Sequence, residues 1–296
     1  MHDVIIVGGG PAGLSAALLL GRCNRRVLVC DSGQYRNARS RGVHGFLSRD
    51  GALPGELLRI SREQLAPYDV ELLRCRVEQA ARIDRGFALT LQDGRRLTGR
   101  KLLLATGIVD ILPPIPGLDA LWGTGALACP YCDGWELRGQ PLAVYGAGAS
   151  ALALALKTWS EDVVYLTDGE ALADDDAASL RDHGVALEPT AVRRFVGDDD
   201  GRLEHVELAD GRRLARAAVF VKHGRRQSSD LAAQLGVPVD DDDGVARGRS
   251  ESTSITGVYV AGDASCDRLF AIIAAAEGVT AALAIHDELR REDHQR

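Results

Sequence analysis

The chain has 296 residues, of which 46% are hydrophobic and 26% charged. That length and composition allow two ordinary domains with real cores and give no sign of disorder. The net charge of −7 comes from 42 acidic and 35 basic residues without a long basic run, so nucleic acid and anionic membranes are not expected as partners. No segment approaches the roughly 18 apolar residues of a membrane span, and no basic region precedes the first apolar run. We therefore expect a cytoplasmic protein whose partners are small molecules or proteins.

The first predicted strand, turn and helix recur later in the chain. Residues 4–20 read VIIVGGGPAGLSAALLL and residues 142–158 read LAVYGAGASALALALKT, each an apolar strand, a glycine turn and an apolar helix. Glycines at the first and third positions permit a tight bend close to a phosphate, and the sixth position, Gly13 or Ala151, must be small for the helix and strand to pack. The repeat predicts an α/β fold with two Rossmann-like dinucleotide-binding domains, each doubly wound in three layers.

The first copy is the more specific of the two. A second strand, VLVCD at 27–31, ends in Asp31, about 20 residues beyond the turn, where a carboxylate accepts the hydroxyls of a ribose. A glycine turn without these neighbours is often an ordinary tight turn that binds no nucleotide. The strand before it, the helix after it and the acid at this distance together predict a nucleotide site.

The remaining elements place the second domain inside the first. Pro113, Pro114 and Pro116 sustain neither a helix nor a central strand, so we place a domain crossing there. The expected domains are residues 1–116 with 245–296, and an inserted domain of residues 117–244. The other predicted elements are a helix at 55–66, strands at 70–76, 87–91 and 101–107, a hairpin at 193–214, a strand at 217–221, a strand within 257–265 and a long helix at 269–291.

These motifs resemble those of the low-molecular-weight thioredoxin reductase-like flavoproteins. They are GGGPAG at 8–13, ATG at 105–107, CPYCDG at 129–134, GAGASA at 146–151 and AGD at 261–263, and they span essentially the whole chain. The resemblance implies FAD in the first domain, and a homodimer. The residues that it implies for FAD are Gly8, Gly10, Pro11, Ala12 and Gly13 at the pyrophosphate, Asp31 at the adenosine ribose, Val77 near the adenine, Thr106 and Gly107 at the flavin, and Gly262 and Asp263 at the ribityl chain or phosphate.

Within that family, two segments look most like the dithiol oxidases that close the disulfides of gliotoxin, holomycin and related metabolites. They are residues 35–58 and the ending AIIAAAEGVTAALAI at 271–285. Ordinary thioredoxin reductases carry an Arg-Gln pair near the start of the last helix, where this chain reads RLFAII. By this similarity Arg36, Asn37 and His44 are flavin-side contacts, and the alternative for all three is a solvated loop.

The residues CPYCDGWE at 129–136 contain the only close cysteine pair in the sequence, and three interpretations compete for it. A structural zinc site needs four ligands, and the nearest candidates lie far away in sequence, so we expect no metal. A structural disulfide that closes so small a loop gains little loop-closure entropy, and it would not persist in a reducing cytosol. A redox role is favoured, because neighbouring cysteines alternate between dithiol and disulfide without large movement.

The resemblance implies different roles for the two cysteines. Cys132 would face the flavin, and Cys129 would exchange with the external thiol or disulfide. Asp133 would be the general acid or base that moves the thiol proton, which requires a pKa raised by partial burial. The alternative for Asp133 is a carboxylate that caps a helix.

The second glycine turn bears on the electron donor. The 2′-phosphate of NADPH calls for arginines after the next strand, but residues 167–169 are Thr, Asp and Gly, followed by further acids. A carboxylate there would repel the phosphate, so we do not expect NADPH to bind. Asp168 remains a candidate acceptor for the ribose of NADH, and Arg225 and Arg226 would partly restore a basic site.

If no nicotinamide binds, the electrons come from thiols. We expect an FAD-dependent dithiol oxidase that forms a disulfide in a small-molecule or protein dithiol, with O2 as acceptor and H2O2 as product. One alternative is a reductase of a thioredoxin-like protein that uses NAD(P)H or ferredoxin. Another is a flavin-binding redox sensor whose cysteine pair switches an interaction.

Overall fold

The computed structural model describes residues 1–239, 244–265 and 268–295, and the chain folds into two compact units. Unit 1 comprises Met1–Ala38, Phe46–Val109 and Arg225–Arg296, and unit 2 comprises Arg39–Gly45 and Asp110–Gly224. Unit 2 is therefore inserted into unit 1. The α/β fold class expected from the sequence is confirmed.

Unit 1 is built on a seven-stranded sheet. Strands β3, β2, β1, β6 and β17 run parallel, whereas β5 and β4 extend the sheet in antiparallel fashion. The strands, in spatial order, are β3 (Val70–Arg74), β2 (Val27–Asp31), β1 (His2–Val7), β6 (Arg96–Leu104), β5 (Gly86–Leu91) and β4 (Val77–Ile83), and β17 (Val258–Val260) also pairs with β6.

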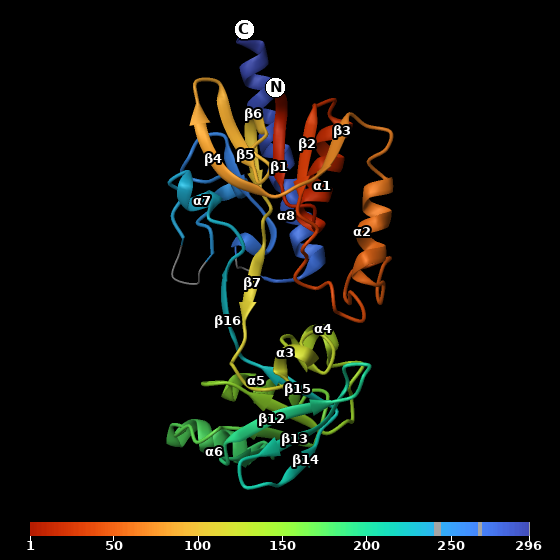
Figure 1. The fold of residues 1–296 in the computed structure, drawn as a ribbon, viewed down its shortest axis with the longest axis vertical. Helices are drawn as coiled ribbons and strands as arrows, with labels where there is room; N and C mark the ends of the chain where they lie inside the picture. The colour runs from red at the N-terminus through yellow and green to blue at the C-terminus, as the bar shows by residue number, and fades with distance from the viewer. Residues whose placement is uncertain (240–243, 266–267, 296) are drawn as a thin grey trace. The chain divides into compact units, whose positions relative to one another are not determined.

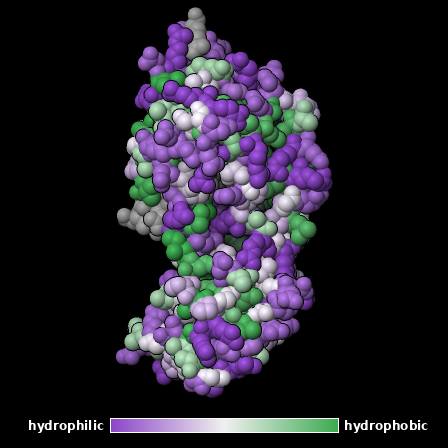
Figure 2. All heavy atoms as spheres, in the orientation of Figure 1, coloured by the Kyte–Doolittle hydropathy of each residue, from purple (hydrophilic) through white to green (hydrophobic). Residues whose placement is uncertain are grey.

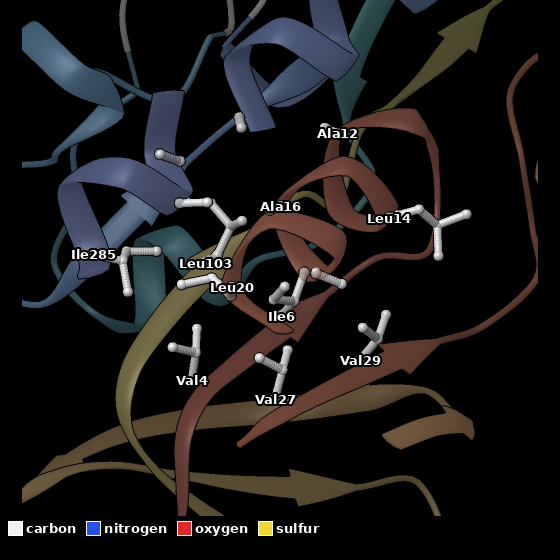
Figure 3. Close-up of a cluster of buried hydrophobic side chains, with 14 of the residues drawn as sticks. Val4, Ile6, Ala12, Leu14, Ala16, Leu20, Val27, Val29, Leu103 and Ile285 are labelled. Carbon is white, nitrogen blue, oxygen red and sulfur yellow. The ribbon is translucent and has the colours of Figure 1, made fainter. Parts of the chain in front are cut away.

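Helices cover one face of this sheet. The helices α1 (Pro11–Arg22) and α8 (Ala271–His294) pack on each other and on alternate residues of β1 and β2. Figure 3 shows Val4, Ile6, Val27 and Val29 beneath α1, with Ile285 of α8 in the same cluster. Alternation of this kind arises because successive side chains of a strand point to opposite faces. The helix α2 (Pro54–Glu63) contributes Leu58 to the cluster.

The opposite face of the same sheet is covered mainly by strands rather than helices. Ile5, Val7 and Leu28 pack there with Phe87 and Leu89 of β5. The short helix α7 (Leu231–Gln234) packs against β4 on this side. Two 3-10 turns, η1 (Arg249–Glu251) and η2 (Gly262–Ser265), precede α8 in the chain.

Unit 2 repeats the same layering. Its parallel sheet has the order β11 (Ala186–Glu188), β10 (Val163–Leu166), β9 (Leu142–Tyr145), β15 (Ala218–Val221) and β8 (Ala126–Leu127). One face carries α5 (Ser150–Leu156) and α6 (Asp174–Asp182), and the other carries an antiparallel sheet of β12 (Val192–Gly197), β13 (Leu203–Leu208) and β14 (Arg213–Ala215). The short helices α3 (Leu118–Leu121) and α4 (Pro130–Asp133) complete the unit. The internal repeat in the sequence thus corresponds to a repeated architecture.

Two details differ from the sequence-based expectation. The predicted hairpin at 193–214 has a third strand, β14, because the turn at Asp210 and Gly211 reverses the chain once more. The chain returns to unit 1 at Arg225 rather than near residue 245. The reason is that Leu231, Val237 and Val245 are buried in the unit 1 core, so these residues belong to its fold. Most of the acidic turn at 240–244 lies outside the described residues.

The chain crosses between the units four times, and two of these crossings are strands of one small sheet. Strand β7 (Ile108–Ile111) leaves unit 1 and pairs with β16 (Gly224–Gln227), which returns to it (Figure 1). On the face drawn in Figure 2, hydrophilic and hydrophobic residues are interspersed. Among the helices of the described residues, none combines the length and apolarity that crossing a bilayer requires.

Candidate functional site

The first glycine turn is packed so closely that side chains are excluded from it. Gly8 has a φ of +115°, and a Cβ built there would lie 2.0 Å from the carbonyl oxygen of Ala105. A Cβ on Gly13 would lie 1.9 Å from the carbonyl oxygen of Gly8. The turn therefore needs glycine at both positions, which is the requirement predicted from the spacing.

Gly10 differs from these two, because it faces open space. A Cβ built on Gly10 meets no described atom within 4 Å. Gly10 is also the N-cap of α1, Pro11 occupies the first turn, and among the described residues no side chain caps this helix. A twelve-residue helix whose first N–H groups face an open space is suited to an anionic phosphate.

Asp31 lies at the end of β2 beside this turn, where its side chain is largely buried. One carboxylate oxygen accepts the N–H of Gly33 at 2.8 Å. The other accepts the hydroxyl of Tyr35 and lies 3.3 Å from the guanidinium of Arg62. A carboxylate has about four acceptor sites, so Asp31 retains capacity for a ribose hydroxyl.

The other cofactor residues predicted in unit 1 have the following surroundings. Gly262 approaches Ala12, with 2.9 Å between a Cβ built on the glycine and the Ala12 Cβ. Asp263 pairs with Arg36 at 3.4 Å. The carbonyl oxygens of Thr106 and Gly107 accept bonds from the side chain and backbone of Ser228 respectively. Asn37 is half-buried in the turn after Tyr35, and Val77 is buried in the core at the start of β4.

Glu277 supports this region and was not predicted from the sequence. Its buried carboxylate accepts the N–H of Gly262 at 2.7 Å and pairs with Arg247 at 3.0 Å. A buried carboxylate is stable only with such partners. Glu277 therefore holds the turn that carries Gly262 and Asp263.

The cysteine pair lies in unit 2 and is oxidised. Cys129 and Cys132 form a disulfide with their Cα atoms 5.3 Å apart, and Cys129 is the N-cap of the four-residue helix α4. Tyr131 and Trp135 beside them are 71% and 64% exposed, which is unusual for aromatic residues of this size. The guanidinium of Arg138 stacks on Trp135 with 4.2 Å to the ring centroid.

Asp133 follows the second cysteine directly and is half-buried. Burial raises the pKa of its carboxyl from 3.8 to about 6, while nearby His44 lowers that pKa and Glu136 raises it. The His44 imidazole lies 3.7 Å from the Glu136 carboxylate. The structure thus brings His44, predicted as a flavin-side contact, next to the acid–base candidate within unit 2.

The second glycine turn contains an internal carboxylate. The N–H of Gly148 donates to both oxygens of Glu170, at 2.9 and 3.2 Å. The hydroxyl of the fully buried Tyr165 donates to Glu170 at 3.0 Å and accepts the N–H of Ala149. A carboxylate of the chain therefore occupies the side of the turn where a dinucleotide pyrophosphate binds in this fold.

Asp168, the candidate acceptor for the ribose of NADH, also has internal partners. It accepts the hydroxyl of Tyr145 at 2.9 Å and the N–H of Val192 at 2.8 Å. Its φ is +52°, and Gly169 follows with +81°. These left-handed residues turn the chain so that Glu170 points back at the glycine turn.

Comparison with known proteins agrees with this geometry. Residues 2–280 match the family model described as pyridine nucleotide-disulphide oxidoreductase. The chain belongs to this family. The crystal structure of HlmI superposes with a TM-score of 0.94 at 40% identity, covering 99% of this chain and 94% of that one. A probable thioredoxin reductase of Arthroderma benhamiae is 31% identical over 98% of this chain and 81% of its own length. The oxidoreductase from Agrobacterium tumefaciens has a TM-score of 0.91 at 34% identity, covering 97% and 98%.

Thioredoxin reductase-like members of the pyridine nucleotide-disulphide oxidoreductase family are flavin-dependent disulfide oxidoreductases, and this protein is accordingly an enzyme of that class. FAD is expected for such members. The tight turn, the open space at Gly10 and the carboxylate of Asp31 fit FAD in unit 1.

Two further thiols of unit 1 are harder to ionise than an exposed cysteine thiol. Burial raises the pKa of both the Cys30 and the Cys75 thiol. Since the thiolate is the reactive form, neither competes with the pair in unit 2. Within the part of the chain that the structure describes, no group of three His, Cys, Asp or Glu side chains is arranged to hold a metal ion.

Proposed function

We propose that this protein is a dithiol oxidase. A dithiol substrate would reduce the Cys129–Cys132 disulfide, with O2 as the final acceptor and H2O2 as product. The overall reaction is balanced: the dithiol and O2 give a disulfide and H2O2. The single observation that carries the proposal is the bond between Gly148 and Glu170, because it argues against a nicotinamide as electron donor.

The electrostatic argument concerns the second glycine turn. A pyrophosphate entering there would meet the Glu170 carboxylate, and a 2′-phosphate would meet acids after β10. Two unit charges of the same sign about 4 Å apart near a protein surface repel by about 4 kcal/mol. Since Asp168 is already bonded to Tyr145 and Val192, a ribose would gain little there. These contacts support thiols as the electron source.

The chemistry of the chain's own residues begins with thiol exchange. A substrate thiolate attacks Cys129 and forms a mixed disulfide, and Cys132 leaves as a thiolate. The second substrate thiol then attacks the substrate sulfur of that disulfide, which closes the product and releases Cys129. Asp133 accepts the proton of an attacking thiol, since its pKa of about 6 leaves it mostly ionised at neutral pH. When bound, FAD supplies the two-electron carrier between the reduced pair and dioxygen.

The exposed aromatic residues beside the pair favour a small ring-bearing dithiol. Tyr131 and Trp135 offer flat apolar surfaces next to Cys129 and Cys132. Aromatic contacts of this kind contribute about 0.5–1.5 kcal/mol beyond the area that they bury. A thioredoxin-like protein is the other partner to test, because curated relatives carry the name thioredoxin reductase.

The expected homodimer has a suitable surface on α8. Ile272, Val279 and Leu283 are 38%, 38% and 52% exposed, and their spacing places them on one helical face. Such a stripe gains from burial against a second copy. The cytoplasmic location stays a prediction from the sequence.

An anaerobic titration of the FAD-loaded enzyme tests the proposal. We expect dithiothreitol, and more rapidly a cyclic dithiol, to bleach the flavin absorbance, whereas NADPH and NADH leave it unchanged. Readmitted O2 should restore the absorbance and yield one H2O2 for each disulfide formed.

The alternatives give different results in the same cuvette. Bleaching by either nicotinamide overturns the oxidase in favour of a nicotinamide-dependent reductase. If only reduced ferredoxin bleaches the flavin, the enzyme is a ferredoxin-dependent reductase. Negligible turnover with O2 for every dithiol tested points to a redox sensor.

A further inference from the structure

We propose that His44 and Glu136 act as a pair of positioning residues that tune the Asp133 carboxyl for proton transfer. This inference rests on the proposed function, in which Asp133 handles the thiol proton. It assigns to His44 a part in the sulfur chemistry of unit 2, in place of the flavin contact expected from the sequence.

The first observation is how firmly the segment that carries His44 is attached. Arg39 donates to the carbonyl oxygens of Asp119 and Ala120, at 2.8 Å to the former. Arg41 donates to the carbonyl oxygen of Asp200 at 2.7 Å, and Val43 is buried. Residues 39–45 therefore belong to unit 2, although their neighbours in sequence belong to unit 1. This anchoring fixes the position of His44 relative to α4.

The second observation is the arrangement of charge around Asp133. His44 pairs with Glu136 at 3.7 Å, with their side chains 23% and 45% exposed. Asp133 is the more buried of the two carboxyls, and both neighbours act on it electrostatically, His44 favouring the ionised form and Glu136 the protonated form. His44 and Glu136 thus act in opposite directions on the pKa of the Asp133 carboxyl.

Other charged groups near this site are occupied elsewhere. The helix α5, which packs on α4, reads SALALAL and contributes only uncharged side chains. Lys157 at its end is bonded to Glu161, and Arg138 stacks on Trp135. The charged groups that act on the pKa of Asp133 are His44 and Glu136, and the reduced pair adds its own thiols. The balance at Asp133 is therefore set chiefly by His44 and Glu136.

A carboxyl tuned in this way suits both halves of the exchange. It must be ionised to accept the proton of a substrate thiol and then give that proton to a departing cysteine thiolate. Catalysis by proton transfer is most effective when the group titrates near the working pH. Burial alone would push Asp133 toward the protonated form, and the nearby His44 limits that effect.

The test is the pH dependence of flavin reduction by dithiothreitol in the anaerobic holoenzyme. For the wild type we expect the rate of flavin reduction to change with pH in a step centred near pH 6, which we call the limb of the pH–rate profile. This limb is well separated from the titration of the reagent's own thiols above about pH 8. His44→Gln should move this limb upward, and Glu136→Gln should move it downward, each by about half a pH unit or more. Glu161→Gln, which changes a 95% exposed carboxylate elsewhere in unit 2, should leave the limb in place.

Limbs that stay where they are in both variants, or that move in the same direction, overturn the proposal, even if the rates fall. A second readout does not depend on electron direction: the carbon-13 shift of the Asp133 carboxyl, identified by its loss in Asp133→Asn. Opposite displacements of that titration support the tuning. If no dithiol bleaches the flavin while these displacements occur, the oxidase assignment fails and the tuning stands.

Discussion

The backbone N–H of Gly148 donates to the carboxylate of Glu170, whose other partner is the hydroxyl of the buried Tyr165. The turn that would receive a pyrophosphate is therefore already bonded to an anion of the same chain. Unit 1 offers a contrast, since Gly10 at the equivalent turn faces open space. The two copies of the turn thus differ: one is bonded to an internal carboxylate and the other faces open space.

Glu170→Ala should remove the hydrogen bonds of this carboxylate to Gly148 and Tyr165 and lower the free energy of unfolding by about 1 kcal/mol. The expected loss is small because Gly148 is exposed, so water can replace the carboxylate as acceptor of its N–H. Urea denaturation measures this change, and Glu161→Ala is the control, with an expected change below about 0.5 kcal/mol. NADPH should still fail to bleach the flavin of Glu170→Ala, because the neighbouring acids remain. Equal stability of the two variants would contradict a structural role for the Glu170 carboxylate.

Gly10→Ala separates cofactor binding from folding. A methyl group at Gly10 meets no atom of the described residues within 4 Å, so the free energy of unfolding of the apoprotein should stay within about 0.5 kcal/mol of the wild type. The same methyl group would intrude on a bound pyrophosphate, so FAD affinity should fall by about tenfold or more, equivalent to about 1.4 kcal/mol. Flavin fluorescence titration measures the affinity. Gly55→Ala, also in open space but in α2, should change neither quantity, and full FAD affinity in Gly10→Ala would place the cofactor elsewhere.

Asp133→Asn should stabilise the protein at alkaline pH. The folded pKa, about 6, lies above the ordinary 3.8, so the folded state holds the proton more tightly than the unfolded chain. The resulting stability is complete below about pH 4 and is lost as the pH rises through about 6. At pH 8 the variant should exceed the wild type by up to about 3 kcal/mol, with no difference at pH 4.

Urea unfolding across this range provides the measurement, and the exposed Asp84→Asn is the control, expected to follow the wild type. The same Asp133→Asn variant should reduce flavin with dithiol about 100-fold or more slowly. A stability difference that is independent of pH would argue against a raised pKa at Asp133.

Thiol alkylation should distinguish the redox pair from the other cysteines. After reduction and treatment with iodoacetamide at pH 7.5, the peptide containing Cys129 and Cys132 should be modified first. Cys30 and Cys75 should react at least about tenfold more slowly in the folded protein, because burial raises the pKa of both thiols. Mass spectrometry of the digest follows each peptide, and denatured protein, in which all react alike, is the reference. Faster labelling of Cys75 would reverse the assignment.

Leu283→Glu tests the apolar stripe on α8. A carboxylate at this 52% exposed position would be buried against a second copy, so the variant should elute as a monomer in size-exclusion chromatography with light scattering. The introduced carboxylate would be solvated in the monomer, so the fold should survive. Asp287→Lys, a change at a polar position one turn further along α8, serves as the control, and a dimer that persists in Leu283→Glu would exclude this surface.

Much of the fold follows from the sequence because its signals are local. Three of these signals each lie within a short segment: the glycine turn at 8–13, Asp31 after the second strand, and the Cys129–Cys132 pair. Their spacing in the sequence is enough to predict their structural roles. Glu170 was missed because its bond to Gly148 depends on left-handed backbone at Asp168 and Gly169. The dipeptide Asp-Gly was the available signal, since both residues tolerate that conformation.

Other relationships depend on the tertiary structure. His44 is far from Asp133 in sequence, and only the anchoring of residues 39–45 on unit 2 brings it there. Glu277 lies in an apolar helix, where the sequence alone predicts that a single acidic residue is exposed to solvent. Its burial is explained by the N–H of Gly262, which donates to it in the folded structure. The return of the chain at Arg225 follows from which core receives Leu231 and Val245, and periodicity does not specify this.

The pairing of β7 with β16 has an evolutionary corollary. Because the outgoing and incoming segments are neighbours, everything between them forms a cassette whose ends already meet. An exchange of this cassette therefore leaves the two backbone ends close together in the host. Only the contacts that residues 39–45 make with unit 2 would have to be rebuilt by the incoming segment.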